Sequence, residues 1–159
     1  MKRLITILLS LLCAVAAFSQ SAEQITKILS SSELTYGEAS YLAATALGLI
    51  SDDAGFGEAI RTAESEKMLK GTHTADEKIN VRDFAYLCAT AWGINDSLFF
   101  WRTHTKRYAL KELKADGIIP ASYKPERHLT GQEALAIVTR CLDRTPEDYG
   151  NTNIEEEEE

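Results

Sequence analysis

The side chains that could do chemistry are scattered along this chain rather than gathered into a motif. His73, His104 and His128 have no ligand-like spacing, so the sequence predicts no metal site. The sequence contains no serine-nucleophile elbow, zinc-protease helix, phosphate-binding loop or calcium loop. Carboxylates are plentiful, but nothing selects a pair that would act together across a cleft. We therefore expect a protein that is not an enzyme and has no cofactor.

The elements that must position any site are built from a repeat. The segment that begins at Ala59 returns at a constant offset of 50 residues, beginning at Ala109, and a partial third copy begins at Thr35. Repeats of this length are typical of stacked helical units that share one core. The sequence thus predicts an all-α domain over residues 20–146, packed as a pseudo-threefold bundle. The units are expected at about 20–50, 56–97 and 98–144.

Each unit is expected to hold two helices joined by a loop. The second helix begins with a polar residue followed three positions later by an acid, which is the pattern of a capping pair. These pairs are Thr35 with Glu38, Asn80 with Asp83, and Thr130 with Glu133. The first helices are expected over residues 57–70 and 105–116, ended by Gly71 and Gly117. Helical spacing predicts buried faces formed by Tyr41, Leu42, Thr45 and Leu49, by Phe84, Leu87, Cys88 and Ala91, and by Ala134, Ile137, Val138 and Cys141.

Cys88 and Cys141 lie on two of these faces. Aligning the repeat places Cys88 opposite Val138 and Cys141 opposite Ala91, which are one helical turn apart. Two interpretations stay open. Each cysteine is a buried thiol that packs as a small hydrophobic residue, or the two form a disulfide in an oxidising compartment.

The N-terminus has the features of a targeting segment. Lys2 and Arg3 precede an apolar run that ends at Phe18, and Ser19 completes a cleavage pattern of small residues. We expect residues 1–19 to be a cleavable signal peptide. The protein is therefore expected to be exported, to the periplasm or the cell envelope.

The net charge of the chain makes some classes of binding partner unfavourable. The 159 residues carry a formal net charge of −7, which becomes −9 when the two basic residues of the signal peptide are removed. Without a basic patch, nucleic acid is not an expected partner. An acidic surface also disfavours anionic membranes, and we expect no stable membrane insertion after signal cleavage. Residues 147–159, which end in five glutamates, are expected to be a disordered acidic tail.

The order of these pieces resembles the S-layer homology (SLH) family. Units of that family consist of an Ala-Ile helix, a Gly-Ile-Ile turn, a Phe-x-Pro loop and a helix that starts with Ile-Thr-Arg-Ala-Glu. The matching segments here are Ala109-Leu110, Gly117-Ile118-Ile119, Tyr123-Lys124-Pro125-Glu126 and Leu129-Thr130-Gly131-Gln132-Glu133. The resemblance spans about residues 33–144 and is weaker in the earlier copy. It implies a non-catalytic helical module that anchors exported proteins to a polysaccharide of the cell envelope.

The resemblance also implies a binding residue. The arginine of the Thr-Arg-Ala-Glu motif contacts sugar in the family, and it corresponds here to Arg82. The same position is Gly37 in the upstream copy and, in one alignment, Gly131 in the last copy. Trp101 is a second candidate, because an aromatic ring beside a groove can stack on a sugar ring. The alternatives are a surface ion pair for Arg82, and packing between units for the run of residues 98–101.

Two functions follow from these observations. The first is a module that binds a cell-wall glycan or another envelope polymer. The second is a periplasmic structural or adaptor protein that docks another envelope protein without binding glycan. The loss of the motif arginine from two copies favours the second function. A homo-oligomer is also an open alternative, because an incomplete third unit would leave an exposed edge.

Overall fold

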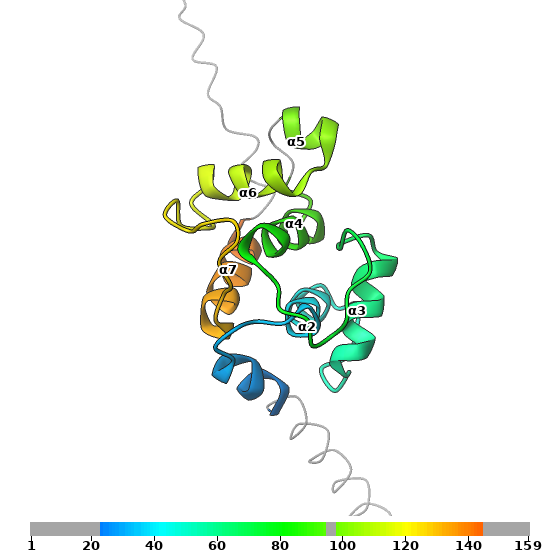
Figure 1. Ribbon diagram of the computed structural model, residues 1–159. Helices are drawn as coiled ribbons and strands as arrows, with labels where there is room; N and C mark the ends of the chain where they lie inside the picture. The colour runs from blue at the N-terminus through cyan, green and yellow to red at the C-terminus, as the bar shows by residue number, and fades with distance from the viewer. Residues whose placement is uncertain (1–22, 95–97, 145–159) are drawn as a thin grey trace, which may run out of the picture.

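Figure 1 shows a computed structural model, which describes residues 23–94 and 98–144. The described residues form helices, turns and two isolated bridges, and they contain no strand, so the expected all-α class is confirmed. A first helix covers residues 23–30. The later helices are α2 (Tyr36–Ala46), α3 (Phe56–Ser65), α4 (Val81–Ala91), α5 (Leu98–Thr103), α6 (Lys106–Ala115) and α7 (Gly131–Asp143). The expected signal peptide and the expected acidic tail lie outside the described residues.

The helices begin where the capping pairs predict. Thr35 and Glu38 form a reciprocal capping box at the start of α2, and Thr130 and Glu133 form another at the start of α7. In each box the side chain of the first residue accepts from the backbone N–H of the acid, whose carboxylate accepts from the N–H of the first residue. The expected pair at the start of α4 is one-sided, because Asn80 accepts from the backbone of Asp83 without the return bond.

The helix ends follow the sequence less closely. α6 ends as expected, with Gly117 in the left-handed region at φ +70. α3 was expected to reach Lys70 and to end at Gly71, and this prediction was wrong. The helix ends at Ser65 because Lys67, which stands where Gly117 stands in the next copy, adopts φ 59. The N–H of Met68 then donates to the carbonyl of Ala63 at 2.8 Å and closes the last turn.

Two of the inner helices pack on an outer helix from the following unit. α2 packs chiefly on α3, and α4 packs chiefly on α6 (Figure 1). The helix over residues 23–30 reaches the start of α7, where Gly131 lies directly against the backbone of Ile28. α2 and α4 are the most deeply buried of the described helices, with nine and eight buried residues. None of the described helices is long and apolar enough to cross a membrane.

The starts of the inner helices are tied to loops by recurring backbone bonds. In α2, the N–H groups of Tyr36 and Gly37 donate to the carbonyls of Glu77 and Ala75, at 2.9 and 3.0 Å. In α4, the corresponding N–H groups of Val81 and Arg82 donate to the carbonyls of Arg127 and Pro125, at 2.8 and 3.0 Å. In α7, the N–H of Gly131 donates to the carbonyl of Ser31 at 2.9 Å. Loops from different copies therefore hold these helix starts in place.

The core contains most of the apolar residues that the repeat predicts. Phe84, Leu87 and Cys88 are fully buried, as are Ile119 and Leu113 of the last copy. Leu49 was expected to be buried, but it is 43% exposed. The reason is that α2 ends at Ala46, so Leu49 lies beyond the helix whose inner face it was expected to continue.

Candidate functional site

At the start of α4, a carboxylate makes its side-chain contacts with other helices. Asp83 is the third residue of α4, at the position of the box-forming glutamates of α2 and α7. Its side chain is one methylene shorter and makes no bond back to the N–H of Asn80. Its Oδ2 instead accepts from the hydroxyl of Tyr36 at 2.6 Å and from Nζ of Lys106 at 3.0 Å. Asp83 thereby links α2, α4 and α6.

Arg82 stands beside this carboxylate. Its backbone is fixed by the bond to Pro125, while its side chain is 42% exposed. Nε lies 3.9 Å from Oδ1 of Asp83, which is an ion pair without a hydrogen bond. Both Nε of Arg82 and Oδ1 of Asp83 are buried atoms that have no hydrogen-bond partner in the structure. A donor and an acceptor therefore remain unused at one place, and each is costly to leave unpaired.

A stacked aromatic pair supports the Tyr36 hydroxyl. The rings of Tyr36 and His73 lie 3.8 Å apart between centroids and 9° from parallel. Nδ1 of His73 lies 3.0 Å from Oε2 of Glu77, and the backbone of Glu77 holds Tyr36. Burial, and then the hydrogen bond to Asp83, raise the pKa of Tyr36 far above its usual range. Tyr36 therefore stays protonated and keeps donating to the carboxylate.

The start of α7 uses its acid differently. Oε2 of Glu133 accepts from the backbone N–H of Thr130 at 3.0 Å, which completes the capping box. Oε1 accepts from the hydroxyl of Tyr123 at 2.8 Å and from Nη2 of Arg127 at 2.6 Å. The guanidinium of Arg127 also lies over the ring of Tyr123, 4.1 Å from its centroid. Both oxygens of Glu133 are therefore engaged within the protein.

These bonds change the acidity of Glu133. Burial alone raises its pKa, but hydrogen bonds from Arg127, from the N–H of Thr130 and from Tyr123 outweigh burial and lower the pKa to about 2. The carboxylate is thus ionised throughout the neutral range. It acts as a structural clamp at the start of α7.

The caps also settle which residues correspond to Arg82. Arg82 is the second residue of its helix, and the second residues of α2 and α7 are Gly37 and Gln132. Gly131 is the first residue of α7, the position that Val81 holds in α4. A Cβ added to Gly37 would come within 2.8 Å of the carbonyl of Ala75, so position 37 has no room for a side chain. Arg82 is the one cation among these three positions.

The other residues that the sequence singled out lie elsewhere. Trp101 belongs to α5, but its side chain lies outside the part of the chain that the structure describes. Its neighbour Phe100 is buried and meets the ring of Tyr86 edge-on at 6.4 Å. Cys88 of α4 and Cys141 of α7 are both buried and both free thiols. Within the described ranges, no group of three potential metal-binding side chains comes together.

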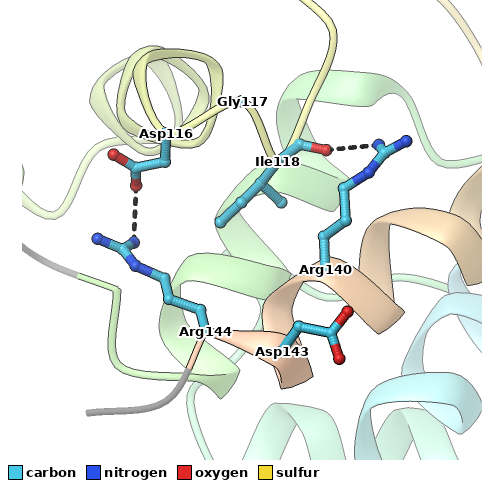
Figure 2. Close-up of a pocket in the computed structure, with 6 residues that line it drawn as sticks. All are labelled: Asp116, Gly117, Ile118, Arg140, Asp143 and Arg144. Carbon is cyan, nitrogen blue, oxygen red and sulfur yellow. Dashed lines mark hydrogen bonds and ion pairs between the residues drawn. The ribbon is translucent and has the colours of Figure 1, made fainter. Parts of the chain in front are cut away.

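A pocket that the sequence did not indicate lies between the carboxyl ends of α6 and α7 (Figure 2). It has a volume of about 450 Å³ and is lined by Asp116, Gly117, Ile118, Arg140, Asp143 and Arg144. Nη1 of Arg140 donates to the carbonyl of Ile118 at 2.9 Å, and Nη1 of Arg144 lies 2.6 Å from Oδ2 of Asp116. Two arginines and two aspartates balance in charge around the pocket, and Ile118 adds an apolar side chain. No motif predicts the pocket because its two walls come from separate helices.

The start of α4 offers a half-exposed guanidinium beside a carboxylate that two donors hold in place. We compared this chain with protein families, with curated proteins and with solved structures, and none of the three comparisons gave a match.

Proposed function

We propose that this protein is a non-catalytic, exported module of the cell envelope that binds a cell-wall glycan at the start of α4. The observation that carries the proposal is the pair formed by Arg82 and Asp83. In this pair, a cation whose side chain is 42% exposed lies beside a carboxylate that two donors hold in place. The sequence resemblance to the SLH family also implies an arginine at the start of the second helix of a unit.

The repeat architecture supports this proposal. In a pseudo-threefold bundle, each inner helix would begin against a loop of the neighbouring unit, and a groove would lie at each such junction. The paired backbone bonds that recur at the starts of α2 and α4, and the single bond at the start of α7, are what such an arrangement requires. The helix over residues 23–30 would complete the first unit by packing against α7.

The chemistry of the site indicates the kind of ligand. Arg82 and Lys106 place two cations beside the carboxylate of Asp83. A guanidinium binds phosphate or carboxylate groups through paired hydrogen bonds. We therefore propose a glycan that bears an anionic substituent.

A pull-down on purified cell-wall sacculi of the source organism tests the proposal. The protein without residues 1–19 is sedimented with sacculi across a salt series, beside Arg82→Ala. We expect the wild type to bind less as salt rises, and Arg82→Ala to bind at least about tenfold more weakly, since a charge-assisted bidentate contact would be lost. Arg61→Ala is the matched control. It removes the same charge from an exposed position of α3 and should bind as the wild type does.

The outcomes separate the two candidate functions. Absence of binding by the wild type would contradict the glycan proposal. Equal binding by the wild type and Arg82→Ala would keep the wall as the ligand and remove Arg82 from the site. The adaptor function is favoured by one observation, which is that Gly37 and Gln132 supply no charge at the two other equivalent positions. It predicts no binding to sacculi, together with capture of a specific envelope protein that survives high salt.

A further inference from the structure

The pocket where α6 and α7 end shares no residue with the start of α4 (Figure 2). Its volume of about 450 Å³ is in the range of pockets that bind small molecules. Gly117 lies on its wall with φ +70, and a Cβ added there would meet no atom within 4 Å, so the space in front of this turn is open. A small molecule can therefore approach the turn that follows α6.

The protein itself holds the two cations of the pocket in place. Nη1 of Arg140 donates to the carbonyl of Ile118 at 2.9 Å and so joins α7 to the turn after α6. The guanidinium of Arg144 pairs with Asp116 at 2.6 Å, and these two side chains are 18% and 25% exposed. Both guanidiniums are therefore fixed on the walls of the pocket, which lowers the cost of ordering them when a ligand binds.

Arg140 and Asp143 carry opposite charges that do not pair with each other. They are three positions apart on α7, a spacing at which opposite charges commonly pair. Figure 2 shows the guanidinium of Arg140 turned towards the carbonyl of Ile118, with no ion pair to Asp143. Within the part of the chain that the structure describes, the exposed carboxylate of Asp143 makes no hydrogen bond or ion pair, and Arg140 makes only the bond to Ile118. The pocket therefore presents a cation and an anion that are both available to a ligand.

We propose that this pocket binds a short peptide with both termini free, whose carboxylate pairs with Arg140 and whose ammonium pairs with Asp143. A guanidinium binds a carboxylate through paired hydrogen bonds. An ammonium is favoured beside Asp143, because the carboxyl ends of helices carry partial negative charge. A ligand with only a negative charge would meet the two aspartates of the pocket, and one with only a positive charge would meet its two arginines. The proposal does not depend on glycan binding, because no residue of the start of α4 takes part in it.

A peptide titration followed by NMR of the backbone amides tests the proposal. Alanyl-alanine is added to the protein without residues 1–19. The matched probes are N-acetyl-alanyl-alanine, which lacks the ammonium, and alanyl-alanine amide, which lacks the carboxylate. We expect saturable shifts at residues 116–118 and 140–144 with alanyl-alanine, and at least about tenfold weaker binding of each matched probe, because each lacks one charge-assisted contact. No saturation up to about 20 mM, shifts centred elsewhere, or equal binding of the three probes would overturn the proposal.

Two variants assign the two ends of the peptide. Asp143→Asn should bind alanyl-alanine and its N-acetyl form about equally, and Arg140→Gln should bind alanyl-alanine and its amide about equally. Asp143→Asn should also keep the wild-type Tm, because the carboxylate makes no bond among the described residues. Arg107→Gln is the matched control, since it removes the same charge from the exposed start of α6 and should leave all three affinities unchanged. If Asp143→Asn or Arg140→Gln weakened all three probes by the same factor, neither end of the peptide would be assigned to that residue, and the proposal would be overturned.

Discussion

The starts of α4 and α7 occupy corresponding places in the repeat, yet they use their acids in opposite ways. At α7, Glu133 closes a capping box and accepts from Tyr123 and Arg127, so its carboxylate serves its own unit. At α4, Asp83 makes no capping box and accepts from Tyr36 and Lys106, which belong to other helices. One methylene separates the two side chains.

This difference shows how a repeat can hold a single site. At the start of α7, the longer side chain of Glu133 makes its hydrogen bonds to its own helix and to the neighbouring loop, and Arg127 is one of these partners. At the start of α4, the shorter side chain of Asp83 makes no bond to the N–H of the cap residue and accepts from adjacent helices instead. Arg82 beside it stays half-exposed. We infer that the start of α7 contributes stability and that the start of α4 contributes binding.

The largest effect is expected from Glu133→Ala. The substitution removes the capping box and leaves Tyr123 and Arg127 without their shared acceptor, so we expect a loss of about 2–3 kcal/mol in the free energy of unfolding. Chemical denaturation measures it. A loss below about 1 kcal/mol would show that the start of α7 is not a clamp.

Acid should weaken the same clamp. The pKa of Glu133 is lowered from 4.5 to about 2, so its contribution is complete above about pH 4.5 and is lost as the pH falls towards 2. We expect about 2 kcal/mol to disappear in this window, a figure already reduced because the side chain is a quarter exposed. Denaturation midpoints measured at several pH values report the loss. Glu133→Gln should lack this part of the acid dependence and is the control.

A smaller loss is expected from Tyr36→Phe. The change removes the hydroxyl that donates to Asp83 and leaves Lys106 as the remaining donor on that oxygen, so we expect about 1–1.5 kcal/mol. Thermal unfolding measures the change. Because the ring remains stacked on His73, a much greater loss would mean that the ring position depends on the hydroxyl.

The smallest expected changes in stability are those of the two arginine variants, Arg127→Ala and Arg82→Ala. Arg127→Ala should cost about 1 kcal/mol, because it removes the donor to Glu133 and the contact with the ring of Tyr123. Arg82→Ala should change stability by less than about 0.5 kcal/mol, because its half-exposed side chain pairs with Asp83 only at 3.9 Å and its Nε makes no hydrogen bond. Equal losses, measured in parallel by denaturation, would contradict the division into a clamp and a binding site.

The sequence was most informative where a local rule decides the structure. The capping boxes at Thr35 and Thr130 and the end of α6 at Gly117 depend on neighbouring residues, and each was predictable. The early end of α3 was not, because a lysine in the left-handed region is uncommon and carries no sequence signal.

The candidate site was predictable only in part. The sequence identified Arg82 through its place in a motif. It did not identify Tyr36 and Lys106 as partners of Asp83, because these contacts join three helices that are separated along the chain. It also did not show that a capping pair with an aspartate would be one-sided. Both depend on the length of a side chain and on the distances between packed helices.

The backbone bonds between the two ends of the domain have a consequence for the order of folding. The N–H of Leu34 donates to the carbonyl of Leu129 at 2.7 Å, and Gly131 lies against Ile28. The segment that leaves the ribosome early therefore finds these partners only after the last helix has been synthesised. Contacts of such long sequence separation slow folding. We expect the chain to stay incompletely packed until synthesis is nearly finished, which would favour passage through an export channel that accepts unfolded chains.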